Sequence, residues 1–286
     1  MNAVVSYPMS PTQTRWREPS VLPGFGPALG FTLFYLSAVV LVPLAALVLR
    51  PWELGFQGFF DAVTAPRVLA ALRLSFGGAA IAAAINGFFG LIVAWVMVRY
   101  DFPFKRFVDA LIDLPFALPT AVAGIALTAL YGPNGWIGSL LAQWGMKIAY
   151  TPAGVIVAMT FIGLPFVVRT LEPVLEDFDR ESEEVAATLG ATRLQTCLRV
   201  VLPGIAPALI TGTALAFARG VGEYGSIIFI AGNIPLVSEI APLVIVTKLE
   251  QFDYAGAAAV GVAMLAISFL ILLAINVLQA WAAKRQ

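Results

Sequence analysis

The sequence contains no histidine, and Cys197 is the single cysteine among its 286 residues. The absence of histidine excludes imidazole acid–base catalysis, histidine metal ligation and a Ser-His-Asp triad. One cysteine cannot form a disulfide within the chain. Cys197 is predicted to lie on an amphipathic helix as a small packed side chain rather than as a nucleophile. No catalytic residue and no metal site is therefore expected.

Charged residues are also scarce, at 12% of the chain, whereas hydrophobic residues make up 60%. The mean hydropathy of +0.89 lies far outside the range of soluble globular proteins. The 17 basic and 17 acidic residues cancel, so the net charge gives no support for a nucleic-acid partner. The composition predicts an integral membrane protein.

Phosphate-binding motifs are missing as well. The sequence has no G-x-x-x-x-G-K-[ST] motif, and no G-x-G-x-x-G follows a predicted strand. This chain is therefore not expected to bind ATP through a phosphate loop. If ATP drives its function, another protein must hydrolyse the nucleotide.

Uncharged windows predict where the chain crosses the membrane, because a spanning helix needs about 18 apolar residues or more. Seven uncharged windows occur, six of them long. The seventh, at 224–238, is too short for a span, so we merge its first part with the predicted fifth helix, which then runs from about Ala206 to Ile230. The sequence predicts an all-α protein with six transmembrane helices. The six long windows are Pro19–Leu49, Leu74–Val98, Leu114–Met146, Ile148–Val168, Val200–Ala218 and Tyr254–Ala283.

A charged segment between the fourth and fifth windows predicts two short capped helices. Asp179 can cap the first, and Gly190 can end it in a left-handed conformation. Thr192 and Gln195 form a capping box that begins the second, and Pro203 is expected to close it. One face of the second helix is apolar and is expected to dock on a partner, through Leu194, Cys197, Leu198 and Val201.

Lysine and arginine give the orientation, because cytoplasmic loops retain them. Eleven of these residues fall on the side that carries both chain ends and the capped helices, and five fall on the other side. We therefore expect both termini in the cytoplasm of a multi-pass protein of the cell inner membrane. The expected organisation is a cytoplasmic tail (1–27), a first transmembrane helix (28–49), a transmembrane core (68–280) with a cytoplasmic coupling loop (176–204), and a cytoplasmic end (281–286).

Two places within the predicted spans are candidates for a substrate path or gate. Pro115 is expected to start the third helix, and Pro119, followed by Thr120, is expected to bend it; bent helices can line a path but are also ordinary in membranes. Arg219 and Glu223, four residues apart, are expected to pair on one helix face.

The pair has two possible roles. Arg219 can lend positive potential to a passing dianion while Gly222 permits close packing or movement. Alternatively, the ion pair only fixes the packing of helices or the interface between subunits. We favour this second role because pairing weakens the electric field of the arginine.

The capped segment resembles the EAA motif in the permease subunits of bacterial ABC importers. The motif residues Glu184, Ala186, Gly190, Leu202 and Pro203 match it, while Val185 stands where the family usually has alanine. The resemblance implies that this loop docks into a groove on an ATPase subunit. From charge alone Glu184 is expected on a solvated helix face, and the motif favours the coupling role.

Two further segments, Leu114–Leu127 and Ala218–Pro235, resemble the permeases of sulfate/thiosulfate and molybdate importers, and a third, Ile240–Ala259, most resembles the T-type permease of the sulfate/thiosulfate importer. The resemblance implies the type I ABC importer permease fold and half of a membrane path for an oxyanion. The implied partners are two ATP-binding subunits that hold ATP and magnesium, a second permease that is a different but related chain, and a periplasmic solute-binding protein. No cofactor is expected in this chain. A molybdate/tungstate permease and a secondary anion transporter are the alternatives.

Overall fold

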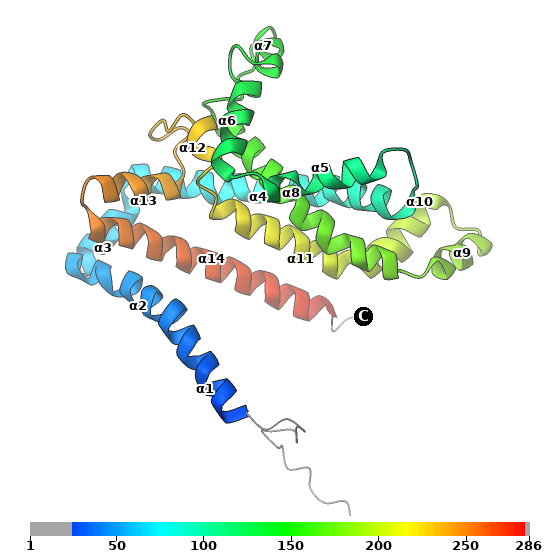
Figure 1. The fold of residues 1–286 in the computed structure, drawn as a ribbon, viewed down its shortest axis with the longest axis horizontal. Helices are drawn as coiled ribbons and strands as arrows, with labels where there is room; N and C mark the ends of the chain where they lie inside the picture. The colour runs from blue at the N-terminus through cyan, green and yellow to red at the C-terminus, as the bar shows by residue number, and fades with distance from the viewer. Residues whose placement is uncertain (1–24, 284–286) are drawn as a thin grey trace, which may run out of the picture. The chain divides into compact units, whose positions relative to one another are not determined.

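The computed structural model describes residues 25–283, so most of the predicted N-terminal tail and the last three residues lie outside the described part. Every regular element in the described part is a helix, which confirms the predicted fold class (Figure 1). The chain divides into two compact units, with the boundary between Ala46 and Leu47.

The first unit contains the first predicted span. Its helix α1 (Phe25–Leu36) continues through a π-helical turn, η1 (Ser37–Leu41), into α2 (Val42–Leu49), which crosses the unit boundary. Charged residues are absent from these elements, so nothing interrupts the apolar run. The second unit then begins with a 3₁₀ turn, η2 (Arg50–Leu54), and the short amphipathic helix α3 (Gly55–Thr64).

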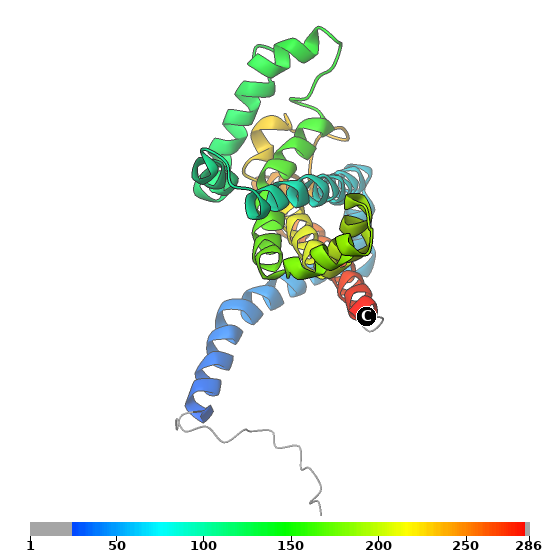
Figure 2. The ribbon, with the colours of Figure 1, turned by 90° about the vertical axis from the view of Figure 1, so that its right-hand side faces the viewer.

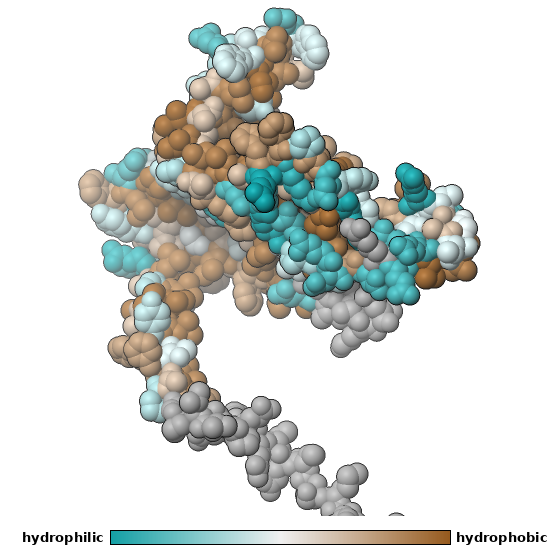
Figure 3. Space-filling model, turned by 45° about the vertical axis from the view of Figure 1, so that its right-hand side comes forward, coloured by the Kyte–Doolittle hydropathy of each residue, from teal (hydrophilic) through white to brown (hydrophobic). Residues whose placement is uncertain are grey.

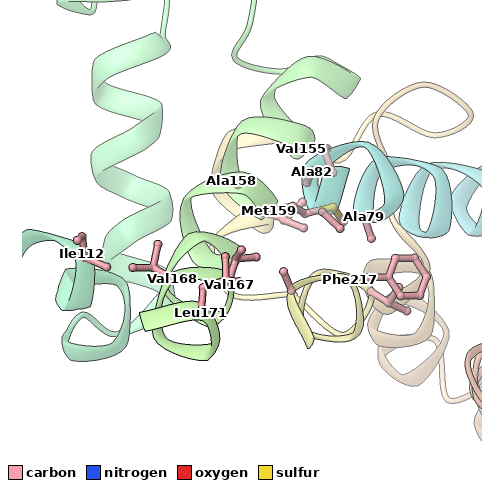
Figure 4. Packing of buried hydrophobic residues seen from close by; sticks show 14 of the residues in the cluster. Ala79, Ala82, Ile112, Val155, Ala158, Met159, Val167, Val168, Leu171 and Phe217 are labelled. Atoms are coloured by element: carbon pink, nitrogen blue, oxygen red, sulfur yellow. The ribbon is translucent and has the colours of Figure 1, made fainter. Parts of the chain in front are cut away.

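Three long helices form the core of the second unit: α4 (Pro66–Arg99), α8 (Pro152–Asp177) and α11 (Leu202–Val221). Small residues let their backbones approach, as is common between membrane helices. A β-carbon at Gly90 of α4, for example, would lie 2.8 Å from a methyl carbon of Val167 on α8. Met159 and Phe217 contribute to the same buried apolar cluster (Figure 4). The last helix, α14 (Tyr254–Ala283), packs against α11 and α13 (Ala241–Glu250).

The third predicted span consists of two helices with a sharp bend between them. Helices α5 (Lys105–Ala117) and α6 (Thr120–Tyr131) meet at 113°, with Pro119 as the N-cap of α6, so the bend lies at the predicted proline. The expectation that Pro115 starts the helix was wrong, because α5 begins ten residues earlier and contains this proline near its end. Figures 1 and 2 show α6 pointing away from the core helices, with α7 (Trp136–Ala142) beyond it.

Five helical segments in the described part are long and apolar enough to cross a membrane, and the bent pair α5–α6 makes six if it counts as one span. The six predicted spans are therefore all represented by helices.

The predicted fifth helix was too long. Helix α11 ends at Val221, and a non-helical stretch separates it from the one-turn helix α12 (Ile227–Ile230). The interruption follows from local chemistry: Glu223 accepts the N–H of Ser226 through its side chain, which bends the backbone out of the helix. Glu223 consequently lies just past the helix rather than on its face.

The capped segment forms α9 (Arg180–Thr188) and α10 (Arg193–Thr196) at one end of the second unit, with α3 and α13 at the other end (Figure 1). The prediction that Pro203 closes the second short helix was wrong. A π-helical turn, η3 (Cys197–Val201), joins α10 to α11, and the N–H of Leu202 bonds to the carbonyl of Cys197, five residues back. This wider turn carries the helix past a proline that supplies no amide hydrogen.

Candidate functional site

The first helix of the coupling loop begins and ends as the sequence predicted. The Asp179 carboxylate accepts the N–H of Glu181 at 2.9 Å and thereby caps α9. Gly190 has φ of +82°, and its N–H bonds to the Ala187 carbonyl, while the N–H of Ala191 bonds to the carbonyl of Ala186. These two bonds form a Schellman motif, which needs a residue that tolerates positive φ.

The second helix begins with the predicted capping box. The Thr192 N–H donates to the Gln195 side chain at 2.8 Å, and the Gln195 N–H donates to the Thr192 hydroxyl at 3.4 Å. Both short helices are thus fixed by hydrogen bonds inside the loop itself. We call this preformed segment, residues 179–201, the elbow.

The elbow presents an uncovered apolar surface. Among the predicted docking residues, Leu194 is 67% exposed, Leu198 is 52% exposed and Cys197 is also exposed, whereas Val201 is buried against the core. Cys197 is therefore not buried within the described part of this chain. Of the motif residues on α9, Glu184 is exposed and Ala186 is buried. Val185 and Leu189, beside them in the sequence, are exposed.

A bond that the sequence did not predict connects this elbow to the core. The guanidinium of Arg99, at the end of α4, donates to the carboxylate of Glu183 on α9 at 2.5 Å. The Arg99 side chain is only 8% exposed, and it also lies over the ring of Trp95. The two charges are 84 positions apart in the sequence, so no local pattern could indicate their pairing.

The second candidate site, at the end of α11, is built around Glu223, which is almost completely buried. One of its oxygens pairs with Arg219, as predicted, and the other accepts the N–H and the hydroxyl of Ser226. The Arg219 side chain remains 32% exposed. Ser226 was not predicted as a site residue, although a serine three residues after an acid is a common local hydrogen-bonding pattern.

The bend before α6 lies against this site. A β-carbon at Gly225 would collide with the side chain of Thr120, and one at Gly124 would collide with the backbone of Ser226. The structure therefore brings the predicted path residue Thr120, next to Pro119, into contact with the segment that follows Glu223. Gly222 ends α11 as its C-cap.

A cluster of charges that the sequence did not predict joins α5 to α8. Arg169 bonds to Asp113 through two nitrogens, at 2.6 and 2.8 Å, and its guanidinium also pairs with Asp109 and Glu172. The spacing of Asp109 and Asp113, one helical turn apart, was the sequence signal for two carboxylates that bind one arginine.

Figure 3 shows the hydrophilic surface gathered toward the part of the second unit that carries α9 and α10.

The fold and these sites can be compared with known proteins. The model of the family described as "Binding-protein-dependent transport system inner membrane component" matches residues 86–286. The chain belongs to this family. It is thus a membrane permease of the ABC importer class, a transport component rather than an enzyme.

Relatives agree with the assignment, and a solved ABC transporter shares the fold. The chain is 49% identical to the sulfate transport system permease protein CysT of Salmonella typhimurium over 93% of this chain and 96% of the relative. It is 47% identical to CysT of Escherichia coli with the same coverage of both chains. A bacterial ABC transporter involved in the import of alginate shares the fold, with a TM-score of 0.74 at 16% identity, over 89% of this chain and 94% of that one.

Proposed function

We propose that this permease forms half of the membrane path of an ATP-driven importer for sulfate and thiosulfate. The observation that carries the proposal is the 49% identity, over nearly the whole chain, to a protein named for sulfate transport. The match spans nearly the whole of both chains and therefore includes the segments on either side of Arg219, where the path is proposed to run.

The geometry at the end of α11 supports an anionic solute. Arg219 is partly exposed and is held from one side by Glu223, so part of its guanidinium can face a passing oxyanion. The carboxylate also lowers the local positive potential, which makes any anion site weak. A weak site suits a path, because the path must release what it admits. We propose Arg219, Gly222, Glu223, Pro119 and Thr120 as path or gate residues.

The elbow supports coupling to an ATPase subunit. Three of the four residues of its apolar stripe are exposed in this chain, and its two helices are held by their own caps. A rigid projection of this kind can pass a domain movement on to the spans as a rigid-body rotation. We propose that Glu184, Ala186, Gly190, Leu202 and Pro203 form the joint, and that two ATP-binding subunits supply ATP and magnesium.

The remaining partners and the orientation complete the proposal. The family description names dependence on a binding protein, which supports delivery of the solute by a periplasmic solute-binding protein. We propose a second, related permease as the other half of the path, the inner membrane as the location, and the cytoplasm as the side of both termini and of the elbow. Labelling of the elbow from the outside of intact cells would contradict this orientation.

Transport by the reconstituted complex tests the function. The assay uses proteoliposomes that contain both permeases and the ATPase, with the solute-binding protein added outside. They are expected to take up labelled sulfate only when ATP is enclosed inside the vesicles, where the ATPase subunits lie. Excess thiosulfate should compete, and molybdate should not. Competition by molybdate alone would favour a molybdate/tungstate permease, and uptake driven by a proton or sodium gradient without the ATPase would favour a secondary transporter.

A further inference from the structure

The elbow contacts all three core helices of the second unit, but in two different ways. Its backbone continues from α8 at Phe178 and into α11 through η3. Helix α4 is not adjacent to the elbow in the sequence, and Arg99 bonds to Glu183 at the point where α4 ends. The ion pair therefore provides a direct side-chain link from the elbow to the third core helix.

The pair has the features of a stiff link. Arg99 is nearly buried, and its guanidinium lies 5.3 Å from the centre of the Trp95 ring, one turn back on α4. In the described residues Glu183 supplies its carboxylate partner, while the buried Nε of Arg99 has no hydrogen-bond partner. Among the described residues Glu183 is the carboxylate that bonds to this guanidinium, and separating the two would leave a nearly buried charge without its bonded partner.

We propose that Arg99 and Glu183 are positioning residues that make α4 move with the elbow when the ATPase subunits close. This inference rests on the proposed function of the elbow as the ATPase joint. The elbow would pull α8 and α11 through the backbone and α4 through this ion pair, so that the core swings as one body. Without the pair, α4 would follow α8 and α11 only through the packing between the helices, and its movement would be less tightly coupled to the elbow.

Glu183 differs in this respect from its motif neighbour. Glu184 is exposed and available to a partner subunit, whereas Glu183 faces its own chain. The two adjacent glutamates thus have different roles. Glu184 is available to the ATPase subunit, and Glu183 bonds α9 to α4 through Arg99.

The test measures sulfate uptake and ATP hydrolysis together in proteoliposomes that contain the complete importer. Glu183→Gln is expected to keep assembly and ATP hydrolysis but to lower the solute transported per ATP by about fivefold or more, the lower end of typical couplings between sites. The charge swap Arg99→Glu/Glu183→Arg is expected to recover part of the ratio. Glu181→Gln removes a charge from the same helix without touching the link, and should keep the wild-type ratio.

A ratio for Glu183→Gln equal to that of Glu181→Gln would overturn the proposal. If Glu183→Gln fails to assemble, the double variant Arg99→Gln/Glu183→Gln, which leaves no unpaired buried charge, is measured in its place and judged by the same comparison. Failure of the proposed function is distinguishable, because then the wild-type complex itself would show no ATP-dependent uptake.

Discussion

Ser226 donates two hydrogen bonds to one oxygen of Glu223, from its backbone N–H at 2.9 Å and from its hydroxyl at 3.0 Å. The other oxygen of this buried carboxylate pairs with Arg219. Both oxygens of Glu223 are therefore occupied by fixed partners, which holds the arginine at the end of α11. Part of the guanidinium stays exposed.

Replacement of the arginine separates a role in the path from a role in packing. Arg219→Gln is expected to reduce the rate of sulfate uptake about tenfold or more, because a hydrogen bond to a charged group contributes about 1.5–3 kcal/mol. The rate is measured in proteoliposomes at equal amounts of assembled importer. An unchanged rate would discard the path role.

A double variant provides the control, since Arg219→Gln alone leaves Glu223 buried without its cation. Arg219→Gln/Glu223→Gln removes both charges and with them the cost of an unpaired buried charge. If Arg219 contacts the solute, uptake stays low in the double variant. If the pair only fixes packing, the double variant regains both assembly and uptake.

The elbow glycine gives a second prediction. Gly190→Asp is expected to abolish uptake and ATPase coupling while the protein still inserts into the membrane. A β-carbon at Gly190 would meet no atom of this chain within 4 Å, but the positive φ strains any residue other than glycine, so we expect the substitution to act through this backbone strain together with its charge and bulk against the ATPase.

Gly190→Asn is the matched control, because asparagine tolerates positive φ and has nearly the same shape without the charge. It should retain more uptake than Gly190→Asp, as measured with both variants in the same proteoliposome assay. Normal uptake by Gly190→Asp would remove this loop from the joint.

The features that sequence analysis predicted correctly are those fixed over a few residues. The cap at Asp179, the left-handed Gly190 and the box of Thr192 and Gln195 each involve groups within five positions of one another. Such local hydrogen bonds are nearly independent of the rest of the fold. Hydrophobic windows predicted the spans for a similar reason, because a lipid environment requires a continuous apolar stretch.

The features that could not be predicted depend on distant partners or on small backbone adjustments. Arg99 meets Glu183, and Arg169 meets Asp113, only after long helices have packed. Pro203 was expected to end a helix, yet one π-helical turn carries the helix past it. Helix α11 ends early because the Glu223 carboxylate accepts the N–H of Ser226, and a hydropathy window cannot detect such a bond.

The contact between α6 and the segment after α11 gives a third prediction. Gly124→Ala should lower the stability of the purified importer by about 1–3 kcal/mol, because its β-carbon would overlap the Ser226 backbone, which cannot rotate away. Thermal unfolding in detergent measures the change. Gly77→Ala is the control: it lies in α4 with no atom within 4 Å of the added carbon, so it should be neutral or slightly stabilising. Equal melting temperatures for the two variants would contradict the close contact.

The N-terminus of α14 gives a prediction on pH. The Lys248 ammonium donates to Asp253 at 2.8 Å, and the Gly256 N–H donates to its other oxygen, so both lower the pKa of Asp253 from its ordinary value of 3.8. Since the folded-state pKa is lower than the unfolded one, this carboxylate contributes stability that is present above pH 3.8 and lost as pH falls through the folded value.

Asp253→Asn is therefore expected to lower the melting temperature of the purified importer at neutral pH. The difference from the wild type should shrink as the pH falls below 3.8 and should disappear only below the lower folded-state pKa, where the wild-type carboxylate is protonated in both states. Asp61→Asn, on the short helix α3, changes the same charge without this pair of bonds and should show no such pH-dependent difference. A difference for Asp253→Asn that stays constant from neutral to acidic pH would show that the carboxylate charge does not stabilise the start of α14.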